Sequence, residues 1–185
     1  MNKILKVLAI SLCALTLVVG SIATTLAYLS MKTDSKQNTF TAGDVNITLT
    51  QTNAANEFTL VPGKTYAVDP KVTVAANSVD CWLFIKIDET LADGVNFADY
   101  LTYGVIDGWT ELENGVYYRK VTSSNADQSF GVIASNTVTA VADRTKAEYN
   151  ALSSKSFKLD FTAYAIQADG FGAVEAAWAE AKTLG

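Results

Sequence analysis

The chain has no histidine and only two cysteines and two prolines among its 185 residues. Without histidine it cannot build a serine–histidine–aspartate triad, a cysteine–histidine pair or the HExxH helix of zinc peptidases. Neither a GxGxxG nor a GxxxxGK[ST] phosphate-binding loop occurs in it. These absences predict a protein that is not an enzyme and that carries no cofactor or catalytic metal.

The candidate catalytic groups are paired carboxylates, which occur at Asp88-Glu89 and at Glu111 and Glu113. Glu111 and Glu113 have the same parity in one predicted strand, so we expect them on the same face of the sheet. Acidic pairs on strands are usually solvated surface, and we favour that interpretation over catalysis. Calcium binding stays open, although no EF-hand spacing supports it.

The scarcity of cysteine means that disulfides do not hold this chain together. Cys13 lies in an apolar N-terminal run, and Cys81 lies in the continuous apolar stretch CWLFIKI. Free cysteines are among the most buried residues, so we predict that Cys81 is a small core residue. The alternative is an intermolecular disulfide.

Basic residues are also few, 14 against 19 acidic ones, for a net charge of −5. A general nucleic-acid binder needs clustered lysine and arginine to displace counterions from phosphates. The charge balance therefore excludes that class of function.

The N-terminus carries an export signal. Lys3 and Lys6 precede an apolar run from Val7 to Val19, and Thr25 and Ala27 place small residues before a cleavage point. This pattern predicts a signal peptide at residues 1–27 that is cut between Ala27 and Tyr28. The uncharged stretch continues to Met31, long enough to span a bilayer, so a retained membrane anchor is the alternative.

Two parts follow the leader. Residues 28–40 are mostly polar and are predicted to be a flexible N-terminal segment, and residues 41–185 are predicted to form one domain. Apolar residues alternate with polar ones over 45–50 and 71–75, as in half-buried strands. The stretch 80–88 is apolar on both faces, which predicts a central strand.

The remaining pattern is mainly that of a β protein. The sequence GWTELENGVYYRKV predicts a hairpin with a type I′ turn at Asn114-Gly115. A further strand is predicted at 157–165. Short helices are predicted at 142–152, with Asp143 as a candidate cap, and at 172–182, and a short helix or helical turn is predicted within 89–104. Together these segments predict a mainly β fold, an antiparallel jelly-roll-like β-sandwich with a few short helices, including a C-terminal helix.

Aromatic residues offer one candidate binding face. Trp109, Tyr117 and Tyr118 lie in or beside the predicted hairpin. They would suit a glycan or a partner protein, although aromatic residues in strands are more often core and cross-strand packing.

Most of the chain, more weakly over residues 89–155, resembles a known family. The stretch TTLAYLSMKTDSKQNTFTAGDVNITLT is similar to the leader and first strand of substrates of the signal peptidase SipW, and LVPGKTYAVDPKVTV and FTAYAIQADGF are similar to later family elements. The residues that carry the resemblance are Ala27, Tyr28, Asn38, Thr39, Phe40, Ala42, Gly43, Pro62 and Gly63. The resemblance implies relatives of the biofilm matrix fibre protein TasA and of camelysin (CalY).

Those relatives are antiparallel jelly-roll-like proteins of Gram-positive bacteria that form extracellular fibres. The resemblance therefore implies a secreted structural protein of the biofilm matrix or cell surface, with a SipW-type signal peptidase, other copies of itself and other matrix components as partners. Camelysin has been described as a metallopeptidase, an activity that we do not expect without histidine.

The leading hypothesis is fibre assembly by strand donation. After cleavage, the segment carrying Tyr28, Leu29, Met31 and Phe40 would add to the open sheet edge of a neighbouring copy. Head-to-tail addition does not close and so makes a homopolymer. The alternative is a cell-surface module that binds a glycan or protein and is retained by an uncleaved N-terminal anchor.

Overall fold

The computed structural model describes residues 30–33, 45–52, 58–90, 95–151 and 158–184. Its architecture is mainly β, with antiparallel sheets arranged as a sandwich and a few short helices, including one near the C-terminus. The predicted fold class is confirmed.

One layer is a five-stranded sheet with the order β1-β11-β5-β8-β7, in which every neighbouring pair is antiparallel. Its strands are β1 (Ser30–Thr33), β5 (Cys81–Thr90), β7 (Thr110–Glu113), β8 (Val116–Val121) and β11 (Lys158–Gln167). The long strands β5 and β11 pair over ten residues, from Cys81 opposite Gln167 to Thr90 opposite Lys158. The stretch predicted to be a central strand is therefore the middle strand of this sheet.

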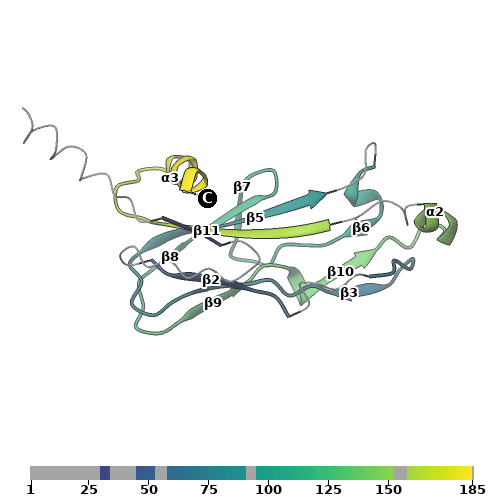
Figure 1. Cartoon of the computed structure of the whole chain (residues 1–185), viewed down its shortest axis with the longest axis horizontal. Coiled ribbons are helices and arrows are strands. Elements are labelled where there is room, and N and C mark those ends of the chain that lie inside the picture. The colour runs from purple at the N-terminus through teal and green to yellow at the C-terminus, as the bar shows by residue number, and fades with distance from the viewer. Residues whose placement is uncertain (1–29, 34–44, 53–57, 91–94, 152–157, 185) are drawn as a thin grey trace, which may run out of the picture.

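Two three-stranded sheets form the facing layer, with the orders β2-β4-β9 and β3-β10-β6. The strands are β2 (Ile47–Thr50), β3 (Thr65–Ala67), β4 (Lys71–Val74), β6 (Leu101–Thr102), β9 (Gln128–Gly131) and β10 (Thr137–Ala140). In Figure 1 β2, β9, β10 and β3 run along one side of the molecule and β11 and β5 along the other.

The helices are short. They are η1 (Phe97–Asp99), η2 (Ala134–Asn136), α2 (Lys146–Ala151), α3 (Val174–Ala181) and η3 (Lys182–Leu184). The short helix or helical turn predicted within 89–104 is the single turn η1, which is followed by β6. The predicted cap of α2 is wrong: Thr145 Oγ1 accepts from Glu148 N at 3.2 Å, and Glu148 Oε2 accepts from Thr145 N at 2.7 Å. This reciprocal capping box takes the role expected of Asp143.

Strand β5 has two buried faces because it packs against a different partner on each. Cys81, Leu83, Ile85 and Ile87 point into the inter-sheet core, which also contains Val72, Val74, Val132, Val138 and Ala140. Phe84 points the other way, into an outer core formed with Val116, Tyr164, Ile166, Ala177, Trp178 and Ala181. Helix α3 covers this outer side, where the rings of Trp178 and Phe84 have centroids 5.2 Å apart.

The hairpin between β7 and β8 exists, but its turn is not the predicted type I′. Gly115 has a φ of 74°, whereas Asn114 is not among the residues with positive φ, and a type I′ turn needs positive φ at both central positions. The strand register also shifts between Glu111 and Glu113. A bulge of this kind breaks the alternation of side chains along β7.

Gly115 occupies a position that only glycine fits. A Cβ atom there would lie 2.7 Å from the carbonyl oxygen of Ile87, and the φ of 74° is unfavourable for other residues. Gly115 O also accepts a hydrogen bond from Ile87 N at 2.7 Å, which ties the turn to β5.

We predict that Gly115→Ala lowers the free energy of unfolding by roughly 1–3 kcal/mol, because the turn must shift away from β5. Urea unfolding followed by circular dichroism measures this loss. Gly131→Ala is the matched control: its Cβ would meet nothing within 4 Å and its φ is not positive, so a change within about 1 kcal/mol is expected. Equal stability of the two variants would contradict the assignment.

Candidate functional site: the edge of the five-stranded sheet

The N-terminal segment forms the outermost strand of the five-stranded sheet. Strand β1 runs antiparallel to β11, with Ser30 opposite Ile166, Met31 opposite Ala165 and Thr33 opposite Ala163. Of the candidate donor residues, Met31 therefore lies in this strand, while Tyr28, Leu29 and Phe40 lie outside the described residues. Part of the segment predicted to be flexible is thus a strand paired with β11.

Strand β11 needs a neighbour at this edge because its middle is buried on both faces. Ala163 and Ala165 belong to the inter-sheet core, and Tyr164 and Ile166 belong to the outer core. An edge strand presents a row of N–H and C=O groups, which template pairing with another strand. Pairing with β1 provides hydrogen-bonding partners along this part of β11.

Strand β1 is also close to other elements at this corner of the fold. It contacts β2 of the facing layer and, on the other side, α3 and η3. Strand β1 therefore lies between β2 of the facing layer and the C-terminal helical segment. Figure 1 shows α3 beside the end of the sheet where β1 lies.

Most residues of the family signature fall outside the described parts of the chain, namely Ala27, Tyr28, Asn38, Thr39, Phe40, Ala42 and Gly43. Pro62 and Gly63 are described, and they form the predicted turn. Lys64 N donates to Val61 O at 3.0 Å, and Gly63 has a φ of 73°. Proline followed by a residue with positive φ is the pattern of a type II turn.

The three residues of the candidate aromatic face do not share a face. Trp109 and Tyr117 pack against the inter-sheet core, whereas Tyr118 packs against the outer core on the other side of the sheet. Tyr117 and Tyr118 are neighbours on β8 and so point in opposite directions. The structure therefore does not bring these residues together as one binding surface.

Trp109 is instead a bridge between the two layers. Its indole Nε1 donates to Gly131 O, at the end of β9, at 2.8 Å. The guanidinium of Arg119 lies 5.4 Å from the ring centroid of Trp109 and 3.9 Å from that of Phe130. Burial lowers the pKa of Arg119 from its ordinary value. The aromatic rings thus hold an internal cation between the sheets.

The carboxylates Glu111 and Glu113 are separated by the bulge in β7, so the expectation that they share a face is wrong. Glu111 pairs with Tyr117, which packs on the inter-sheet side. Glu113 Oε1 accepts from Trp178 Nε1 at 2.6 Å, on the side of α3. Asp88, beside Glu89, forms an ion pair with Lys86 at 2.7 Å.

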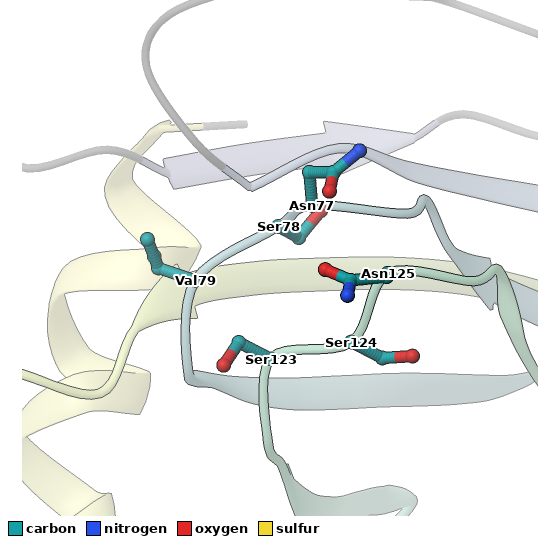
Figure 2. A pocket seen from close by; sticks show the side chains of 6 residues that line it. All are labelled: Asn77, Ser78, Val79, Ser123, Ser124 and Asn125. Atoms are coloured by element: carbon teal, nitrogen blue, oxygen red, sulfur yellow. The ribbon is translucent and has the colours of Figure 1, made fainter.

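Sequence reasoning overlooked a polar pocket of about 440 Å³ between the turn after β4 and the loop after β8. Figure 2 shows its lining, which comprises Asn77, Ser78, Val79, Ser123, Ser124 and Asn125. Two hydrogen bonds fix both loops: Asn77 N donates to Ser124 O at 2.7 Å, and Ser123 N donates to the side-chain oxygen Oδ1 of Asp80 at 2.8 Å. Asn77-Ser78 signals a turn in the sequence, but nothing there indicates a pocket.

Among the described residues, no group of three or more cysteine, aspartate or glutamate side chains is placed to hold a metal ion. The same residues include no helix that is long and apolar enough to cross a membrane. The predicted leader at 1–27 lies outside them.

Comparisons of the chain with models of known protein families, with curated proteins and with solved structures found no match. The resemblance to SipW-dependent matrix proteins therefore continues to rest on the sequence motifs alone.

Cys81 is fully buried in the inter-sheet core and forms no disulfide. Its predicted role as a core residue is confirmed. Burial, with a smaller contribution from the charge of Asp80, raises the pKa of the thiol to about 12. Because the thiolate is the reactive form, this environment suppresses its chemistry at neutral pH.

We predict that the folded protein resists thiol reagents at Cys81. In a Cys13→Ser variant, which leaves one thiol, alkylation at pH 8 should be at least about a hundredfold slower in buffer than in 8 M urea. Mass spectrometry of the labelled protein over time measures both rates. Rapid stoichiometric labelling of the folded chain, or a disulfide-linked dimer through Cys81, would contradict this burial.

Proposed function

We propose that this chain is a secreted structural protein, a fibre subunit of the cell surface or of a biofilm matrix. In the fibre, the N-terminal segment of one copy pairs with β11 of the next. The observation that carries the proposal is the position of β1: residues 30–33 of the segment expected to act as donor pair with β11 as the edge strand of their own sheet.

The same pairing can form within one copy or between two. Residues 34–46, which join β1 to β2, span up to about 45 Å when extended, enough to carry the strand to a neighbouring edge. Exchange of an identical element between protomers keeps every native contact of the element and adds a link. Since each copy donates at one place and accepts at another, the contact is heterologous and builds an open filament.

In this assembly, cleavage of the leader would decide whether the chain can polymerise. Residues 1–27 would direct export, and a SipW-type peptidase would cut between Ala27 and Tyr28. The cut frees the end that precedes β1, and β1 can then pair with β11 of a neighbour. If the leader is retained, the same segment lies beside the membrane, and the protein is anchored instead of polymerised.

The proposal assigns no catalytic role and no cofactor. The alternative, an anchored module that binds a glycan or protein through Trp109, Tyr117 and Tyr118, has less support because these side chains lie on two sides of one sheet. Other matrix components remain proposed partners of the fibre.

Strand exchange can be tested by disulfide trapping between two different variants. Met31 and Ala165 are opposite residues, and such pairs have Cβ atoms about 5 Å apart. We predict that Met31→Cys and Ala165→Cys proteins, each lacking Cys13, form a mixed disulfide when combined under assembly conditions and oxidised. Non-reducing electrophoresis and mass spectrometry identify the linked pair.

The matched control combines Met31→Cys with Asp160→Cys. Asp160 lies on the same strand, is exposed, and pairs with Asp88 on one side without a partner in β1. Random collision would link both pairs equally, and that outcome would contradict ordered exchange.

We also predict that the chain beginning at Tyr28 forms filaments, whereas a chain lacking residues 28–40 does not, because it has no donor. Electron microscopy and sedimentation show the difference, and circular dichroism shows whether the shortened chain is folded. A Tyr28 chain that stays monomeric at high concentration over a range of pH would refute the proposal.

A further inference from the structure

A second cleft, of about 260 Å³, opens between the two layers at the end of β5. Its walls are mainly aromatic and aliphatic, and they come from η1, β6, β8 and the segment after β6. The apolar and aromatic lining residues are Phe97, Leu101, Tyr103, Val105 and Tyr117. Glu89 also lines the cleft. The rings of Phe97 and Tyr103 meet edge to face, with centroids 5.9 Å apart.

One carboxylate, Glu89, lines the cleft, and a second, Glu111, lies opposite a lining residue. Tyr103 donates its hydroxyl hydrogen to Glu89 Oε1 at 2.8 Å, which holds that carboxylate at the cleft. Glu111 pairs with Tyr117 across β7 and β8. Tyr117 lines the cleft, so the hydrogen bond of Tyr103 and the strand pairing of Tyr117 place Glu89 at the cleft and Glu111 beside it. Burial first, and then the two carboxylates, raise the pKa of both Tyr103 and Tyr117.

No basic side chain of the described residues neutralises these two carboxylates. In the described parts of the chain, Lys86 forms an ion pair with Asp88, and Arg144 forms ion pairs with Asp99 and Glu148. Glu89 and Glu111 take part in none of them. The cleft therefore combines aromatic faces and negative charge without a cation of its own.

The same face of β8 already shows how this fold accommodates a cation. Arg119 is two residues beyond Tyr117 and so points to the same side of the strand. Its guanidinium lies over the rings of Phe130 and Trp109. Aromatic rings attract cations through the negative charge of their faces.

We propose that this cleft binds a primary alkylammonium group. The ammonium would lie by Tyr103, Tyr117 and the two carboxylates, and the carbon chain would lie against Leu101 and Val105. Three N–H donors suit the carboxylate and phenol oxygens as acceptors. A hard metal ion suits the cleft poorly, because it needs six or more oxygen ligands. The inference is independent of the fibre assignment.

The test is a titration of the purified protein with n-butylammonium, followed by two-dimensional NMR. We expect saturable shifts that map to the cleft, and much weaker shifts with 1-butanol, which has the same chain without the charge. Tetramethylammonium has the charge without N–H donors and should also bind more weakly. Equal effects of butanol and butylammonium would overturn the proposal.

The variant that tests the site is Glu89→Gln with Glu111→Gln. Both side chains are exposed, and glutamine still accepts the hydrogen bond of Tyr103, so the fold should persist. We expect affinity for butylammonium to fall about fivefold or more. Glu175→Gln, which removes an exposed charge in the first turn of α3, is the matched control and should bind as the unchanged protein does. Unchanged binding by the double variant would overturn the proposal.

Two sources can supply such a group: a free amine, or a lysine of another copy of this chain. Titrations at two protein concentrations separate them. Competition by a second copy raises the apparent Kd for butylammonium as the protein concentration rises, whereas a site for free amines keeps the same Kd.

Discussion

The ten-residue pairing of β5 with β11 is the interaction on which the rest of this fold depends. Both strands are buried on both faces along their middles. Each face therefore needs a cover: the two three-stranded sheets provide it on one side, and α3 provides it on the other. Strand β8 covers the free edge of β5, and β1 covers the free edge of β11. The helix, the facing layer and the N-terminal strand are thus consequences of one deeply buried pair.

Apolar periodicity was enough to predict the central features of the fold. CWLFIKI is apolar at every position except Lys86, and only a central strand between two covers can bury it. The alternation around Phe161 likewise identifies β11, and the alanine-rich end identifies α3. These predictions succeed because burial of a whole face is worth more than any local preference.

Features set by one or two backbone angles could not be predicted in the same way. The bulge in β7 changes the face of Glu113 without any mark in the composition of TELE. The sequence does contain the capping box of α2, as Thr145 followed three residues later by Glu148. Asp143 is the predicted cap instead because it precedes the helical pattern. Strand β1 is only four residues long, and its partner, not its composition, makes it a strand.

The shortness of β1 has a consequence for assembly. If the same four residue pairs form within one copy and between copies, their hydrogen bonds cancel in the difference between the closed monomer and the fibre. The equilibrium between closed monomer and fibre then depends on two concentrations. One is the effective concentration of a copy's own β1 at its β11, which the length of residues 34–46 sets, and the other is the concentration of neighbouring copies. Under the proposed exchange, an effective concentration of about millimolar, typical of a short linker, would favour closed monomers in dilute solution. The proposed fibres would then form where export concentrates the protein at a surface, or where contacts between successive subunits add to the exchanged strand.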